Sequence, residues 1–152
     1  MPDALPPEQP HASRRRWMAV LARAGADELS DAIGDAPEYR VLRGPDAGLV
    51  MVRGRTGGGG APFNLGEMTV TRCSVRTAAG FVGHAYIAGR NERAAELAAL
   101  ADALLQDPAS QSRLQAALIE PLVAAQQARR DVVAAKAAAT RVQFFAMRNM
   151  RA

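Results

Sequence analysis

The sequence predicts an α+β protein, in which an antiparallel sheet of four strands, or slightly more, lies between N-terminal and C-terminal helices. Two patterns among its 152 residues support this fold class. Apolar residues recur at helical spacing near the start and through the last third, whereas the middle alternates with the period of two that is typical of strands. Because short turns separate the expected strands, we expect an antiparallel meander with helices packed against one face.

The N-terminal part is expected to contain a tail and two short helices. Residues 1–12 include four prolines and are expected to be a disordered tail, so that residues 13–150 form a single α+β domain. Ser13 is the expected N-cap of a helix with the sequence "RRRWMAVLARA", whose apolar residues share one face at the spacing i, i+3, i+4. Gly25 is expected to end this helix, and a second short helix, "DELSDAIG", follows.

The middle of the chain is expected to contain two hairpins. The segments "YRVLR" and "LVMVRGR" predict two strands joined by the turn "GPDAG" at residues 44–48. After a glycine-rich loop, "MTVTRCSVRT" at residues 68–77 and "FVGHAYIAG" at residues 81–89 predict the second pair of strands. The short turn "AAG" between this second pair again indicates antiparallel neighbours.

The last third is expected to be helical. Asn91 is the expected cap of a helix over residues 91–106, which carries a clean apolar stripe. A shorter helix, "SQSRLQAALIE", is expected to stop or kink before Pro121, because proline cannot donate a backbone hydrogen bond. Another helix covers residues 122–140, and the end, "RVQFFAM", is expected to be a strand or a partner-binding segment.

Composition narrows the possible functions. The formal net charge is +4, and Lys136 is the only lysine, so nearly all the positive charge is arginine. Arginine binds carboxylate or phosphate in a bidentate manner, and the modest charge fits an acidic partner, a phosphorylated ligand or neither. A nucleic-acid-binding protein is disfavoured, because "RRR" and the Arg129–Arg130 pair are its only support beyond the net charge and no recognised motif accompanies them.

The cysteine and histidine content argues against a disulfide-stabilised protein and against a zinc-binding protein. Cys73 is the only cysteine, which rules out an intrachain disulfide, and with only His11 and His84 beside it a zinc site is not expected. The N-terminus lacks the apolar core of a signal peptide, and no run approaches the roughly 20 apolar residues that a membrane helix needs. We therefore expect a cytoplasmic location and no membrane association.

The stretch "RTGGGGAPFNLGEMTVTRCSVR" at residues 55–76 places four glycines in a row. It is not a phosphate-binding loop of the Walker type or a dinucleotide fingerprint, because both need a helix next and a strand follows here. Consecutive glycines can aim several N–H groups at one anion, with Arg53, Arg55 and Arg72 around it. The alternative is a mobile connection in which glycine serves only to allow a positive φ.

The strand after the loop has a mixed pattern. Arg72 and Arg76 alternate with Val70 and Ser74 on one face. This mixture suits a protein interface, where arginine is enriched and lysine depleted, although a solvated strand with ordinary arginines fits equally well.

No catalytic set is apparent. His84 is expected to be a hydrogen-bonded structural residue, and Cys73, inside a strand, a buried and inert thiol. Glu67 could act as a base, but the sequence shows no positioned partner for it.

Several of these segments together resemble a known family. "RTGGGGAPFNLGEMTVTRCSVR", "GFVGHAYIAGRN", "RRRWMAVLARA" and "TRVQFFAMR" resemble, in this order-specific combination, the G subunit of the bacterial carbon–phosphorus lyase core complex. The resemblance covers about residues 13–150. The family pattern Gly-Gly-any-Gly fits residues 57–60, whereas Gln143 and Ala146 depart from an acidic residue and a threonine that are usual there.

The resemblance implies an accessory role in the bacterial use of phosphonates. It implies a core assembly of two copies each of the G, H, I and J subunits, in which G associates most directly with the nucleosidase-like I subunit. With G, H and L present, the I subunit displaces adenine from MgATP with an alkylphosphonate and gives ribose alkylphosphonate triphosphate. A later step on the J subunit, with an iron–sulfur cluster and S-adenosylmethionine, breaks the C–P bond. The resemblance implies neither a catalytic residue nor a cofactor for this chain.

Two functions remain open from the sequence: an accessory subunit of that complex, and a small anion-binding module that uses the glycine-rich loop. Both point to the same candidate contact residues. These interface or anion-contact candidates are Arg53, Arg55, Gly57, Gly58, Gly59, Gly60, Arg72, Arg76, Phe144 and Phe145.

Overall fold

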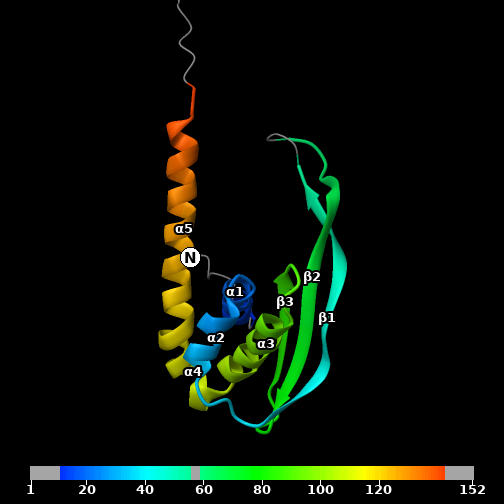
Figure 1. The fold of residues 1–152 in the computed structure, drawn as a ribbon, viewed down its shortest axis with the longest axis vertical. Helices are drawn as coiled ribbons and strands as arrows, with labels where there is room; N and C mark the ends of the chain where they lie inside the picture. The colour runs from blue at the N-terminus through cyan, green and yellow to red at the C-terminus, as the bar shows by residue number, and fades with distance from the viewer. Residues whose placement is uncertain (1–10, 56–58, 143–152) are drawn as a thin grey trace, which may run out of the picture.

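The computed structural model describes residues 11–55 and 59–142. Helices and strands follow one another in three groups, two helices, three strands and a helical C-terminal third (Figure 1). In chain order they are α1 (Ala12–Leu21), α2 (Ala26–Ile33), β1 (Tyr39–Gly54), β2 (Phe63–Thr77), β3 (Val82–Ala88), α3 (Glu92–Gln106), α4 (Pro108–Leu114), a π-helical turn (Gln115–Ile119) and α5 (Glu120–Ala139). The α+β fold class is confirmed.

The N-terminal helices bury the apolar faces that their spacing predicts. Trp17, Val20 and Leu21 of α1 are all buried. The expected cap was wrong, because α1 begins at Ala12, before Ser13, and no side chain caps it. Gly25 caps the start of α2 rather than the end of α1, and its amide donates to the Glu28 carboxylate at 2.9 Å.

The sheet has three strands in the described residues, in the order β1-β2-β3, and both pairs are antiparallel. The expected fourth strand was wrong, because β1 runs through "GPDAG" without turning back. Register shifts on either side of Arg43 absorb the extra residues as bulges, and Gly44 takes a φ of 72°, which favours glycine. Beyond the bulges, Asp46 accepts hydrogen bonds from Arg72 and keeps β1 in register with β2.

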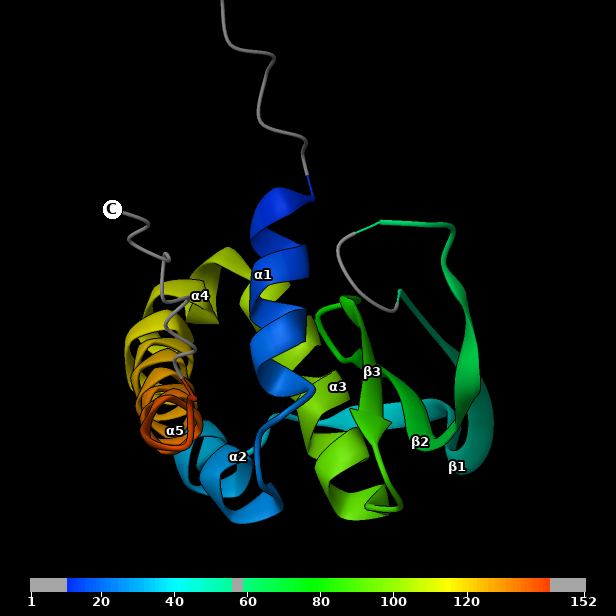
Figure 2. The same ribbon diagram turned by 90° about the horizontal axis from the view of Figure 1, so that it is seen from above.

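Helix α3 is the centre of the core. It contacts all three strands as well as α1, α2 and α4, and most of its residues are buried (Figures 1 and 2). Its many alanines allow close approach on every side. Gly83 of β3 lies directly against it, because a Cβ there would collide with the backbone carbonyl of Ala99. The Asn91 cap is confirmed, since its side chain accepts from the Ala94 amide at 3.0 Å.

The C-terminal helices form one continuous helical run. The expected stop before Pro121 was wrong, because α4 passes through the π-helical turn directly into α5. Pro121 lies in the first turn of α5, and the wider π turn, in which the Glu120 amide donates to the Gln115 carbonyl, accommodates it. The chain thereby extends two elements toward the same end of the molecule, α5 on one side and the β1–β2 hairpin on the other (Figures 1 and 2).

Candidate partner interface

The far half of the β1–β2 hairpin extends beyond the rest of the sheet. Strand β3 pairs with β2 only between Val70 and Arg76, so the hairpin is a two-stranded ribbon past Val70. We call residues 49–54 with residues 63–69 the apolar hairpin. Its large apolar side chains are exposed to solvent: Leu49 by 64%, Met51 by 52%, Val52 by 36%, Phe63 by 44%, Leu65 by 56% and Met68 by 41%.

The pairing register tells which way these side chains face. Leu49 lies opposite Thr69 and Met51 opposite Glu67. By strand alternation, these pairs belong to the same face as Thr71, which is fully buried against the core. The core-facing side of the sheet therefore continues past the core, and there Leu49 and Met51 are left uncovered by the residues that the structure describes.

The far half of α5 is a second uncovered element. Gln126 is the last buried residue of this helix, and its side chain donates to the Val20 carbonyl at 2.9 Å. Every residue from 127 to 139 is exposed, including Val132 and Val133. An exposed ion pair between Arg129 and Glu28, 3.4 Å apart, links it to the body of the protein. A helical segment of this length is marginal alone, even when rich in alanine, so a partner is expected to stabilise it.

The described part of the glycine-rich loop, Gly59 and Gly60, lies at the tip of the apolar hairpin. Gly59 and Gly60 form a bend, and Gly60 has a φ of 102°, which requires glycine. Open space surrounds both residues. Gly57 and Gly58 lie outside the described residues, as do the other two candidates, Phe144 and Phe145, near the C-terminus.

The arginines expected around the loop are not gathered there. Arg53 and Arg55 are exposed near the loop, and Arg53 pairs with Asn64. Arg72 lies eight residues further along β2 than Asn64, about 26 Å at the rise of a strand. It binds Asp46 at 2.8 Å, which raises the pKa of the Arg72 guanidinium through that hydrogen bond. An anion-binding role for the loop itself stays a prediction.

Arg72 and Arg76 belong instead to the outer face of the sheet, opposite α3. Three rows of side chains cross the strands there. The rows are Arg40–Arg76–Val82, Arg43–Ser74–His84 and Asp46–Arg72–Tyr86. We call this surface the outer arginine face. Sequence patterns gave no signal for Arg40 and Arg43, because only the register places them beside Arg76.

His84 is hydrogen-bonded, as expected. Its Nδ1 lies 2.8 Å from the Ser74 hydroxyl oxygen on the outer arginine face. Its backbone amide donates to Asp102 on the other side of the strand, at 2.9 Å.

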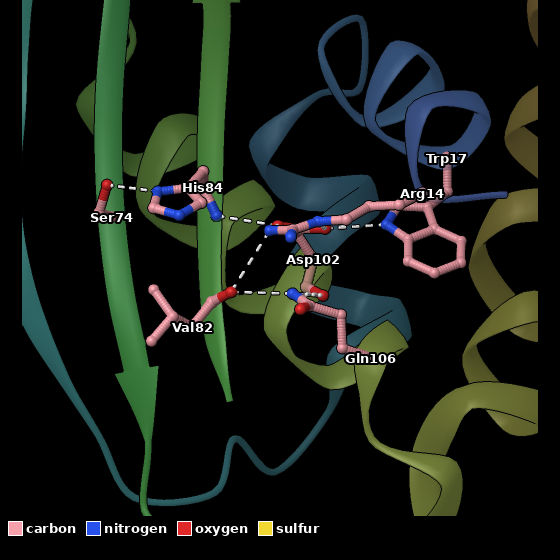
Figure 3. A network of polar contacts seen from close by, with 7 residues as sticks. All are labelled: Arg14, Trp17, Ser74, Val82, His84, Asp102 and Gln106. Atoms are coloured by element: carbon pink, nitrogen blue, oxygen red, sulfur yellow. Dashed lines mark hydrogen bonds and ion pairs between the residues drawn. The ribbon is translucent and has the colours of Figure 1, made fainter. Parts of the chain in front are cut away.

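Asp102 is the centre of a buried polar network that sequence reasoning missed (Figure 3). Its fully buried carboxylate accepts from Arg14 at 2.7 Å and from the Trp17 indole at 2.9 Å, in addition to the His84 amide. Gln106, one turn later, donates to the Val82 carbonyl at 2.8 Å. The network joins α1, β3 and α3, and it has no open position for a substrate atom because its donors already occupy the carboxylate.

The remaining reactive groups are inert or isolated. Cys73 is buried, and burial, with the nearby Glu96 carboxylate, raises the pKa of its thiol to about 11. Glu67 is exposed on the apolar hairpin. Within residues 11–55 and 59–142, no three potential metal ligands gather, and no helix has the length and hydrophobicity to cross a membrane.

Comparison with known proteins identifies the family of this chain. The model of the family "Phosphonate metabolism protein PhnG" matches residues 12–149. The chain is also 50% identical, over 139 residues, to a Rhizobium meliloti (strain 1021) protein, the alpha-D-ribose 1-methylphosphonate 5-triphosphate synthase subunit PhnG. That alignment covers 90% of this chain and 88% of the relative. The chain therefore belongs to the PhnG family of phosphonate metabolism proteins.

Proposed function

We propose that this chain is an accessory, non-catalytic subunit of a complex that makes ribose alkylphosphonate triphosphate in phosphonate catabolism. The observation that carries the proposal is the apolar hairpin, whose Leu49 and Met51 extend the core-facing side of the sheet and are left exposed by residues 11–55 and 59–142. The relative from Rhizobium meliloti is named as a synthase subunit, which supports a hetero-oligomer.

The proposed complex is the carbon–phosphorus lyase core. The chain would associate with the H, I and J subunits, most directly with the nucleosidase-like I subunit, and act functionally with the L subunit in the cytoplasm. It would support displacement of adenine from MgATP by an alkylphosphonate. The iron–sulfur cluster and S-adenosylmethionine of the later C–P cleavage would belong to the J subunit, and this chain would carry no cofactor of its own.

The energetics of the apolar hairpin favour such a role. Full burial of one leucine, phenylalanine or methionine side chain stabilises a structure by about 1.5–3 kcal/mol. Leu49, Met51 and Leu65 leave most of this unrealised in the isolated chain, since each is more than half exposed. Obligate subunits typically bury such apolar surface against their partners. A partner that covers the hairpin would gain this stabilisation and fix the orientation of the whole subunit.

A co-expression experiment tests the proposal. The tagged chain is produced with untagged cognate H, I and J subunits, and co-purification is measured together with adenine release from MgATP and methylphosphonate, with L supplied. The double variant Leu49→Asp/Met51→Asp should lose co-purification, because it places charges on the uncovered core-facing side. Leu42→Asp is the matched control, since Leu42 is exposed by 43% at the other end of β1.

Each outcome of this experiment is informative. Loss of assembly in the double variant, with normal assembly of Leu42→Asp, supports docking through the apolar hairpin. Normal co-purification of the double variant would reject the hairpin as the interface. Full adenine release without this chain would reject the accessory role altogether.

A further inference from the structure

Arg40 and Arg76 face each other across neighbouring strands on the outer arginine face. They are direct register partners in the antiparallel pair β1–β2. Direct partners in an antiparallel sheet point to the same side, and like charges placed directly opposite each other are destabilising. Both side chains are exposed. The fold therefore holds two positive charges together at an energetic cost.

The described part of the chain does not neutralise this pair. Its ion pairs join Arg14 to Asp102, Arg72 to Asp46 and Arg129 to Glu28. Arg40, Arg43 and Arg76 take part in none of these ion pairs. Arg72, which like Arg76 was a candidate from the sequence, is by contrast already neutralised by Asp46. The unbalanced charge lies at the end of the sheet opposite the apolar hairpin.

The surface is hollowed at this pair. Arg40 and Arg76 line a recess with a volume of about 240 Å³, together with Glu38, Tyr39, Thr77 and Ala78. Glu38 supplies the one carboxylate of the lining, so two positive charges face one negative charge. A recess of this size holds a small anionic group, whereas a flat array of arginines would instead fit a protein surface.

The next row of the face adds polar groups. Arg43 lies opposite Ser74, and Ser74 lies opposite His84. The Ser74 hydroxyl occupies Nδ1 of His84, which leaves Nε2 as the ring nitrogen that can meet a ligand. Arg43, Ser74 and His84 thus place further polar groups in the row next to Arg40 and Arg76.

We propose that the Arg40–Arg76 recess binds a tetrahedral phosphorus oxyanion, that is, a phosphate or phosphonate group. Two guanidinium groups offer more N–H donors than the two oxygens of a carboxylate can accept, whereas a phosphate or phosphonate end presents three oxygens and up to two negative charges. The choice of phosphorus rests on the proposed function, since substrate and product of such a complex carry phosphonate and triphosphate groups. The placement at the recess rests on the charges and the pocket alone.

The site is tested on the full-length chain by itself, so that a failure of partner docking does not affect the result. Isothermal titration at physiological ionic strength measures binding of tripolyphosphate and, separately, of methylphosphonate. The variant Arg40→Gln/Arg76→Gln should weaken the Kd of the bound probe at least tenfold. Its thermal midpoint should stay unchanged or rise, because the opposed charges are removed.

The matched control is Arg23→Gln/Arg113→Gln. It removes the same net charge from two exposed arginines that lie on the helical part and donate only to backbone carbonyls, those of Ala19 and Ala32. This control should change the Kd less than twofold. An equal loss in both double variants would mean that the probe senses only net charge, and this would overturn the proposal.

The two probes identify the source of the oxyanion. Binding of tripolyphosphate alone assigns the recess to the triphosphate, binding of methylphosphonate alone assigns it to the phosphonate, and binding of both assigns it to the shared group. Absence of binding for both probes overturns the proposal. The proposal is also overturned if Arg40→Gln/Arg76→Gln keeps its affinity for the probe but loses co-purification with the partner subunits, since the face would then dock an acidic protein surface.

Discussion

The carboxylate of Asp102 lies 2.7 Å from the guanidinium of Arg14, although 88 residues separate them in the chain. Asp102 is fully buried, whereas the Arg14 side chain is 29% exposed, so the cation keeps contact with water and the anion does not. The carboxylate is therefore held by its donors alone. These donors come from α1 and β3, and Asp102 thereby fastens both elements to α3.

Replacement of Asp102 by alanine should destabilise the protein by about 3 kcal/mol. The substitution would leave the Trp17 indole N–H and the His84 amide without their acceptor. Breaking a buried ion pair costs about 3–5 kcal/mol, and we expect the low end of this range because Arg14 can be hydrated. Urea unfolding followed by tryptophan fluorescence measures the change. Asp131→Ala, at an exposed position on α5, should stay within about 0.5 kcal/mol. Equal stability of the two variants would contradict the role assigned to the network.

Gly83→Ala should separate β3 from α3. The added Cβ would meet the backbone of Ala99 and Ala103, and neither a strand nor a helix interior can move away cheaply. We expect a loss of several degrees in thermal midpoint or failure to fold. Gly66→Ala is the matched control, because Gly66 lies in β2 of the same sheet with open space around it. A wild-type midpoint for Gly83→Ala would mean that β3 packs less tightly than described.

The stability of the protein should fall at high pH in a way that depends on Tyr39. Its hydroxyl donates to Glu96 at 2.7 Å, and this hydrogen bond, with burial, raises the pKa of Tyr39 to about 12. Because the folded pKa lies above the usual value of 10, the contribution is fully present below pH 10 and is lost as the pH rises from about 10 to about 12. Tyr39→Phe should remove this contribution to the dependence of the free energy of unfolding on pH.

The measurement is chemical unfolding at a series of alkaline pH values. Cys73 titrates in an overlapping range, since its pKa is about 11, so the comparison is made between Tyr39→Phe and wild type with Cys73 present in both. Tyr86→Phe, on the opposite face of the sheet, leaves the Tyr39–Glu96 bond intact. If the free energies of unfolding of Tyr39→Phe and wild type fall in parallel with rising pH, the Tyr39–Glu96 hydrogen bond does not contribute to the alkaline loss of stability.

The thiol of Cys73 should be nearly unreactive in the folded protein. A pKa near 11 rather than 9 leaves about a hundredfold less thiolate at pH 8, and the thiol is 2% exposed. Labelling by a thiol-reactive chromogenic disulfide should therefore be at least about a hundredfold slower than in urea. Rapid stoichiometric labelling of the native protein would indicate that the strand opens readily.

Some elements could be predicted from the sequence because their signals are local. The cap at Asn91 and the apolar stripe behind it need only neighbouring residues, and both are present in α3. The prediction of a turn at residues 44–48 also rested on a local signal, since glycine, proline and aspartate are typical of turns, and it was wrong. The conformation of this segment depends on the distant Arg72, which binds Asp46 and keeps β1 a single bulged strand.

The candidate site depended even more on distant partners. The exposed arginines of β2 were visible in the sequence, but their neighbours Arg40 and Arg43 could not be found without the register and its bulges. Asp102 was not recognised for another reason, since an acidic residue in an alanine-rich helix is typical of a solvated face. Only the arrangement of α1 on α3 brings Arg14 and Trp17 to it.

The position of α1 determines the order in which this protein can fold during translation. Trp17 binds Asp102, and the Val20 carbonyl accepts a hydrogen bond from Gln126. The first helix to leave the ribosome therefore has no docking surface until the last third of the chain has followed. In the meantime the strands of the apolar hairpin are already synthesised and exposed. Release of the nascent chain near its partner subunits would shorten this vulnerable interval, so co-translational assembly would be an advantage for this protein.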